Sequence, residues 1–315
     1  MQPLPLSARN PGSIALLTAV CFLPLILGLA VVADGSRTWI ARERLQNGVE
    51  ASATAVAKKW ASTGTACGVA EMAYISADGA TASSQHCTTT GTSKSGTVVI
   101  DASGTVDLFF GNLLGRAHSH ISSSTGVRLG APHSMIGLWP FALCANVPEV
   151  AAWLTSQLTS TASYTITFES QKPACSGGAS GNWGAIDFNG GSNSTSETNT
   201  WITSGYSAPV VVGSLLAGNP GVPSSSLNIA SAIGKTFLFA LYDTATGSGN
   251  NANFHVVGFA TAKLISARLT GGNAQRSLTI QFLRDSESGV IGSGITNYGV
   301  TAWTVCSQDA QGACQ

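Results

Sequence analysis

The chain opens with an uncharged, mostly apolar run from Ile14 to Ala33, and no charged residue occurs between Arg9 and Asp34. About 20 apolar residues, each rising about 1.5 Å in a helix, would cross the roughly 30 Å hydrocarbon core of a bilayer. The run therefore predicts one transmembrane helix. Pro24 is compatible with this prediction, because transmembrane helices tolerate proline where neighbouring groups satisfy the freed backbone. The predicted membrane-anchor residues are Ile14, Leu16, Leu17, Phe22, Leu23, Pro24, Leu27, Leu29 and Val32.

A cleaved export signal is the alternative for this run. Val31, Val32 and Ala33 would pass as a cleavage site made of small residues. The hydrophobic part of a signal peptide usually has about 7–15 residues, and this run is longer. The length therefore favours a retained anchor.

After the run, apolar residues recur at spacings of four, four, three and four, which is the period of one helix face. These stem-helix positions are Leu45, Val49, Ala53, Val56 and Trp60. Alanines between residues 51 and 57 favour a helix, and Gly48 should cost about 1 kcal/mol relative to alanine. The pattern predicts that the transmembrane helix continues as a long stem helix to about residue 62. The alternative is an ordinary anchor followed by a separate core helix.

Farther along, the pattern changes to the two-residue period of strands. The stretch 97–110 reads as strand, turn and strand, with the turn at Ser103 and Gly104. Residues 148–157 could form a short helix. Further strands are expected near residues 164–168, 210–212, 237–241, 254–257 and 278–282. The expected fold is α+β, with a mainly antiparallel β region outside the cytoplasm. The expected domains are a tail (1–12), the transmembrane and stem helix (13–62), a pilin-like α/β region (63–135) and a β-rich domain (136–315).

Composition narrows the function. Only 10% of the 315 residues are charged, the formal net charge is zero and 36 residues are glycine. We do not expect the protein to bind nucleic acid, because the sequence has no basic patch that would displace counterions from phosphates. The six cysteines outside the apolar run form no C-x-x-C pair and fit disulfides of an exported protein. Sequential pairing is expected, with buried free thiols as the alternative: Cys67–Cys87, Cys144–Cys175 and Cys306–Cys314.

The charges around the apolar run conflict with placing the later part of the chain outside the cytoplasm. Arg37, Arg42 and Arg44 follow it, whereas only Arg9 precedes it. By the positive-inside rule these arginines favour a cytoplasmic C-terminal part. The cysteines and the neutral, polar bulk favour the opposite orientation, which we adopt.

Residues 11 to about 58 resemble the N-terminal segment of Tad/Flp pilus-assembly proteins of the TadE/TadG-like family. The shared pattern is Gly-Ser-Ile-Ala at the entry, a hydrophobic span, Asp34 and Arg37 at the exit, and Arg44-Leu45-Gln46-Asn47 before an alanine-rich helix. Later stretches that look like the same proteins are FFGNLLG (109–115), GLWPFALC (137–144), GNWGAIDFNGG (181–191), IGKTFLFALYD (233–243) and HVVGFA (255–260). The resemblance implies a single-pass inner-membrane protein that takes part in pilus biogenesis.

One position departs from the prepilins of such systems, which are cut after a glycine and carry a glutamate five residues beyond the cut. Here the fifth residue after Gly12 is Leu17, and no acid occurs before Asp34. The departure disfavours both peptidase processing and polymerisation as a major pilin.

The sequence contains only weak signals of a catalytic, metal-binding or ligand-binding site. Asp101-x-Ser103-x-Thr105 is close to the metal motif of von Willebrand type A domains, but the expected hairpin lacks the helix that should follow. His118-x-His120 could place two imidazoles on one strand face, yet a solvated loop is favoured. Asp285 and Glu287 show no spacing that demands a glycosidase pair. Trp183 and Trp201 could offer a glycan platform, although core positions are favoured.

The expected function is therefore a membrane-anchored, non-catalytic accessory or minor-pilin-like component of Tad/Flp pilus assembly and surface attachment, with no cofactor and no metal. Its expected partners are other pilus or pseudopilin components, and membrane lipid along the N-terminal helix. It is expected in the cytoplasmic membrane, with its bulk in the periplasm or at the cell surface. The alternatives are an anchored or secreted envelope hydrolase and an adhesin that binds surface glycan.

Overall fold

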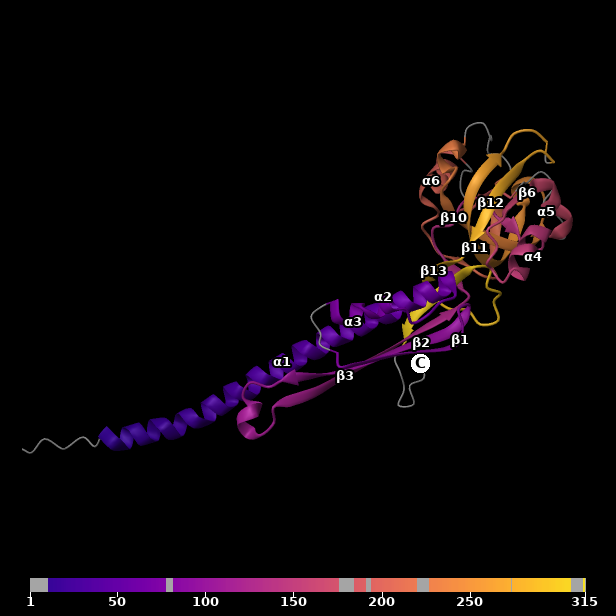
Figure 1. Cartoon of the computed structure of the whole chain (residues 1–315). Helices are drawn as coiled ribbons and strands as arrows, with labels where there is room; N and C mark the ends of the chain where they lie inside the picture. Colours follow the sequence, from indigo (N-terminus) through magenta and orange to yellow (C-terminus); the bar gives the residue numbers. More distant parts are fainter. Residues whose placement is uncertain are drawn as a thin grey trace, which may run out of the picture. The chain divides into compact units, whose positions relative to one another are not determined.

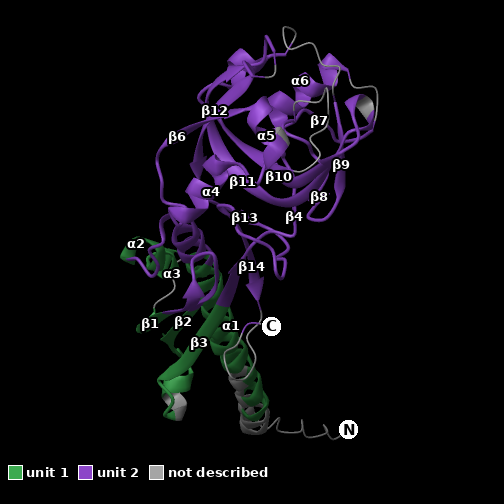
Figure 2. Ribbon diagram, turned by 90° about the vertical axis from the view of Figure 1, so that its right-hand side faces the viewer, with its two compact units in different colours: residues 1–53, 69–87, 100–125 green, residues 54–68, 88–99, 126–315 purple. Residues whose placement is uncertain are grey.

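A computed structural model describes residues 11–77, 82–175, 184–190, 194–219, 227–272, 274–306 and 314. Within these ranges the chain divides into two units (Figure 2). Unit 1 comprises residues 1–53, 69–87 and 100–125, and unit 2 comprises residues 54–68, 88–99 and 126–315.

The helices begin with α1 (Pro11–Thr63), which contains Pro24 and is drawn as one long helix in Figure 1. The uncharged run and the stem pattern thus belong to one helix. The shorter helices are α2 (Val69–Met72), α3 (Tyr74–Ala77), α4 (Pro148–Thr155), α5 (Phe168–Ala174) and α6 (Thr195–Ser204). Single 3-10 turns are η1 (Gly111–Leu114), η3 (Ile229–Ala232) and η4 (Gly249–Asn251).

In the described residues, one sheet has the strand order β1-β2-β3-β14-β13. These strands are β1 (Ser84–Thr92), β2 (Ser95–Asp107), β3 (His118–Gly130), β14 (Val300–Cys306) and β13 (Asp285–Ser288). Strand β14 pairs antiparallel with β3 and parallel with β13.

A second described sheet forms the body of unit 2 in the order β5-β10-β11-β12-β6, and β9 joins β11 and β7 beside that path. Its pairs are antiparallel apart from β5 with β10. Its strands are β5 (Leu143–Cys144), β6 (Ser163–Thr167), β7 (Ile186–Asp187), β9 (Leu215–Gly218), β10 (Thr236–Thr246), β11 (Asn253–Arg268) and β12 (Ser277–Leu283). A separate pair joins β4 (Ser134–Met135) to β8 (Val210–Val211). The expected α+β class with a mainly antiparallel β region is confirmed.

The core of unit 2 is aromatic. Trp139 is fully buried and stacks on Phe237, with ring centroids 4.8 Å apart, and Trp153 stacks on Phe282 at 5.7 Å. Alternate residues of β12 point into this core, as the two-residue period of the sequence indicated.

The expected turn at Ser103 and Gly104 is wrong, because β2 runs through both residues. Its buried positions are Val98, Ile100, Ala102 and Gly104, so the two-residue alternation continues across the Ser-Gly pair. A glycine in a strand usually marks a close approach of backbone or a bend, and it does not by itself end the strand. The chain reverses only after Asp107, through the 3-10 turn η1.

Gly48 shows why a glycine occurs in the middle of α1. A Cβ atom at this position would lie 2.6 Å from the carbonyl oxygen of Ile75 and 2.8 Å from its Cα, both in α3 of unit 1. Since two backbones meet here, neither side can move away as a flexible side chain would.

We expect Gly48→Ala to lower the melting temperature of the full chain in detergent, corresponding to a loss of about 1–3 kcal/mol from overpacking. Gly35→Ala is the matched control, because nothing lies within 4 Å of a Cβ atom there and the same helix should gain about 1 kcal/mol. Equal stabilisation by both substitutions would contradict the close approach of α3 to α1.

Candidate functional site

The end of the uncharged run is tied to the turn that joins β2 and β3. The carboxylate of Asp34, on α1, accepts backbone N–H bonds from Phe109, Phe110 and Gly111 at 2.8, 2.9 and 2.7 Å. All four residues belong to unit 1. The bond from Phe109 connects residues that are 75 positions apart in the sequence.

The backbone of the turn is arranged to present these donors. Leu108 donates its N–H to Ala117, and Arg116 donates its N–H to Gly111, which closes the turn. Gly115 lies in the left-handed region at φ 77°, a conformation that glycine adopts at little cost. Three consecutive N–H groups therefore converge on one anion, as at the start of a helix.

Electrostatics favour the ionised form of Asp34. Partial burial raises the pKa of its carboxyl, but the hydrogen bonds from Gly111, Phe109 and Phe110 outweigh this, and the charge of Arg37 adds to them. The net effect is a pKa below the ordinary aspartate value. Asp34 therefore fastens the β2–β3 turn to α1.

This lowered pKa predicts how the turn responds to acid. A carboxyl with a depressed folded pKa contributes stability that is present above its unfolded value, about 3.9, and is lost as pH falls through the folded value. Amide-exchange protection at Phe109, Phe110 and Gly111 should stay constant from neutral pH down to about pH 4 and fall only below that. Loss of protection between pH 7 and 5, after correction for intrinsic exchange, would contradict the assignment.

The predicted anchor residues fall on α1, ahead of this tie. Within the described part of the chain, no helix combines the length and the apolar character needed for a membrane crossing. The side chains of Ile14, Leu16, Leu17, Leu23 and Leu27 lie outside the described residues. Phe22, Pro24, Leu29 and Val32 are exposed on α1. The transmembrane anchor stays a prediction.

The five stem-helix residues Leu45, Val49, Ala53, Val56 and Trp60 are all buried. In unit 2, Trp60 packs so closely that a Cβ atom on Gly96 would lie 2.9 Å from its ring. The neighbouring Lys58 lies over the Trp303 ring, 4.9 Å from the centroid. Along its C-terminal half, α1 thus contributes one face to protein packing.

The disulfide prediction is confirmed. Cys144 bonds to Cys175 and Cys306 bonds to Cys314, and Cys67 and Cys87 are the other two disulfide-bonded cysteines. Cys21 is exposed and not in a disulfide. The alternative of buried free thiols is therefore wrong for these six residues.

Other predicted candidates occur in different surroundings. His118 pairs with Asp107 at 2.7 Å, and the side chains are 63% and 81% exposed. Asp101 accepts a hydrogen bond from Ser124 on the neighbouring strand. The described residues contain no group of three or more His, Cys, Asp or Glu side chains placed to hold a metal ion. Trp201 is 7% exposed and so offers no free ring face, and Trp183 lies outside the described residues.

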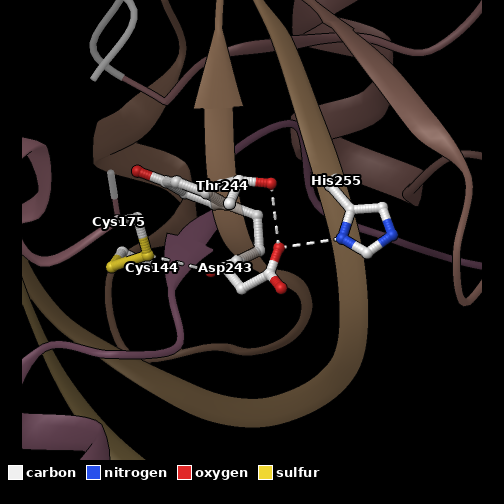
Figure 3. A network of polar contacts seen from close by, with 6 residues as sticks. Cys144, Cys175, Asp243, Thr244 and His255 are labelled. Atoms are coloured by element: carbon white, nitrogen blue, oxygen red, sulfur yellow. Dashed lines mark hydrogen bonds and ion pairs between the residues drawn. A yellow bond between two sulfur atoms is a disulfide. The ribbon is translucent and has the colours of Figure 1, made fainter. Parts of the chain in front are cut away.

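Unit 2 holds a histidine–carboxylate pair that the sequence did not indicate. His255 on β11 lies 2.8 Å from Asp243 on β10, and Thr244 donates a hydrogen bond to the same carboxylate (Figure 3). Burial raises the pKa of the Asp243 carboxyl, but the bonds from His255 and Thr244 outweigh it and hold the pKa low. The antiparallel register places Thr244 opposite His255, which brings the pair together.

A cavity of about 620 Å³ also lies within unit 2, and two acids line it. Asp285 accepts hydrogen bonds from Thr261 Oγ1 and from the N–H of Ser286. Burial raises the pKa of the Glu287 carboxyl, the charge of Asp285 raises it further and Lys58 lowers it. The Cys144–Cys175 disulfide does not line this cavity. In Figure 3 it lies near the pair formed by His255 and Asp243.

Comparison with known proteins gives a family match over one segment of the chain. A family model described as "Putative Flp pilus-assembly TadE/G-like" matches residues 12–59. No curated protein and no solved structure matches the chain. The resemblance drawn from residues 11–58 is therefore shown for this segment, which coincides with α1 and contains Asp34. The match indicates involvement in Tad/Flp pilus assembly.

Proposed function

We propose that the chain is a membrane-anchored, non-catalytic accessory component of Tad/Flp pilus assembly that resembles a minor pilin. The observation that carries the proposal is the family match over residues 12–59, which covers nearly all of α1 (Pro11–Thr63). In this account α1 serves two purposes. Its first part anchors the chain in lipid, and its second part supports the extracytoplasmic units.

The absence of an early acid supports an accessory role. In the pilin model, a glutamate near the mature N-terminus neutralises a neighbouring amine in apolar surroundings, where an unpaired charge is costly. Here Leu17 occupies the corresponding position. Asp34 cannot substitute for it freely, because its carboxylate already accepts three N–H bonds from the β2–β3 turn.

Disulfides support a location outside the cytoplasm for the bulk of the chain. Such bonds form and persist in oxidising compartments and are rare in the cytosol. Three separate regions of the chain contain disulfide-bonded cysteines. We therefore place the first part of α1 in the cytoplasmic membrane and the rest of the described chain on its outer side, in contact with other pilus or pseudopilin components.

The proposal is tested by deleting the gene and counting surface pili by electron microscopy. We expect fewer pili and weaker surface attachment, both restored by a plasmid copy. Normal pili and attachment in the deletion strain would reject the proposed function. Export of an unrelated periplasmic protein is the control for general envelope damage.

An envelope hydrolase is the second candidate, because Asp285 and Glu287 line the same cavity in unit 2. A carboxyl with a raised pKa beside a second carboxylate is the arrangement that acid–base hydrolysis requires. Purified protein would be incubated with cell-wall polysaccharide, with Glu287→Gln as the inactive variant. Release of reducing ends that depends on Glu287 would support a hydrolase, and equal release by both proteins would reject it.

A further inference from the structure

The β2–β3 turn lies where the uncharged part of α1 ends. Asp34 is the first charged residue after the run, and its carboxylate holds the turn at that level of the helix. Figure 1 shows the N-terminal part of α1 extending past the turn between β2 and β3. Residues 11–33 of this helix number 23, a length of about 34 Å, which is close to the thickness of the hydrocarbon core.

The turn exposes aromatic and cationic side chains. Phe109 is 70% exposed and meets the ring of Phe110 edge-on, with centroids 5.0 Å apart. Arg116, near the C-terminal end of the same turn, is also exposed. We call Phe109, Phe110 and Arg116 the tip surface. Phenylalanine is among the apolar side chains that interfacial segments bury at the boundary between headgroups and acyl chains.

The helix presents the same chemistry within the first two turns after Asp34. Trp39 is 66% exposed on α1, and Arg37 is exposed one turn after Asp34. The acids of this region have other partners, because Asp34 accepts the N–H bonds of the turn and Asp107 pairs with His118. Two cationic side chains, Arg37 and Arg116, are exposed around the tip, and a guanidinium group binds the anionic phosphates of a bilayer surface.

We propose that the tip surface docks on the outer face of the membrane that α1 enters, with its rings among the headgroups and Arg116 on anionic lipid phosphate. This proposal rests on the proposed membrane anchor. Asp34 then acts as a positioning residue, since it sets the height of the tip relative to the anchor. The arginines that follow the uncharged run would then contact lipid headgroups on the outer side of the membrane. This contact would explain why they lie outside the cytoplasm, in the orientation that the disulfides favour.

The test uses the full chain in a Cys21→Ser background, reconstituted in nanodiscs of phosphatidylcholine with or without phosphatidylglycerol. A nitroxide is attached at one position at a time through Asn112→Cys, Thr105→Cys or Phe22→Cys. Asn112 is exposed on η1, and Thr105 is the matched control, exposed on β2 of the same hairpin. Accessibility of each label to oxygen and to a water-soluble nickel complex reports its depth in the bilayer.

We expect the label at residue 22 to lie deep in the bilayer. The label at residue 112 should be protected from nickel several-fold more than that at residue 105. Phosphatidylglycerol should increase this protection, and Arg116→Gln should remove the increase. Phe109→Ser should remove the protection in both lipids.

Three results would overturn the proposal. Equal nickel access at residues 112 and 105, with residue 22 deep, would refute tip docking and leave the anchor intact. Protection of residue 112 that appears only when a nanodisc holds two chains rather than one would show that a second copy of the chain covers the tip. A water-exposed label at residue 22 would refute the anchor itself, and the proposed function with it.

Discussion

Replacing Cys144 and Cys175 together with alanine is expected to lower the free energy of unfolding of the chain by about 4 kcal/mol. In the chain-entropy model, the loss grows with the number of residues in the closed loop, and these cysteines are 31 positions apart. Both residues are fully buried, and the N–H of Cys144 also donates to Gln171 Oε1 at 2.8 Å. Denaturant unfolding followed by tryptophan fluorescence measures the change, because Trp139 and Trp153 are buried in unit 2.

The Cys306–Cys314 disulfide provides the matched control. It spans only 8 positions, so the same model gives a loss of about 2.5 kcal/mol for Cys306→Ala with Cys314→Ala. The larger loss should follow removal of the Cys144–Cys175 bond. Equal losses, or a larger loss in the control, would contradict the account of unit 2.

Asp34→Ala should release the β2–β3 turn from α1. The three N–H groups of Phe109, Phe110 and Gly111 would lose their shared acceptor, and each charge-assisted bond typically slows local opening by about tenfold or more. Hydrogen exchange of these amides should therefore accelerate by at least about tenfold, while the exchange of unit 2 stays unchanged. Asp34→Asn should give a partial effect, because its amide offers one acceptor oxygen without a charge.

Asp107→Ala is the control for this substitution. It removes a carboxylate of the same hairpin that bonds the exposed His118, so the tip amides should keep their normal exchange rates. Unchanged exchange in Asp34→Ala, or equal acceleration in both variants, would show that Asp34 does not hold the turn.

Local patterns in the sequence predicted much of the fold. The three- and four-residue spacing from Leu45 to Trp60 identified the buried face of α1, and residues 148–157 contain helix α4. Alternation in 278–282 identified β12. Such patterns succeed because the side chains of one helix or strand face a common core, whichever partners complete it.

What the sequence could not predict depends on contacts between distant segments. The turn expected at Ser103 and Gly104 proved to be continuous strand, because pairing with neighbouring strands outweighs the local preference of a Ser-Gly pair. The tie from Asp34 to Phe109 and the pair of Asp243 with His255 need the folded backbone to bring the groups together. One signal was available for the first, since Asp34 is the only acid near the end of the uncharged run.

The central claim is that the chain acts in pilus assembly while anchored through α1. The most direct measurement counts surface pili in a deletion strain that carries either the intact gene or a copy in which a cleavable signal peptide replaces residues 1–33. Immunoblots and non-reducing gels would confirm that both proteins are exported and form disulfides. The account predicts that the intact gene restores pili and the released form does not. Full restoration by the released form would contradict the anchored role.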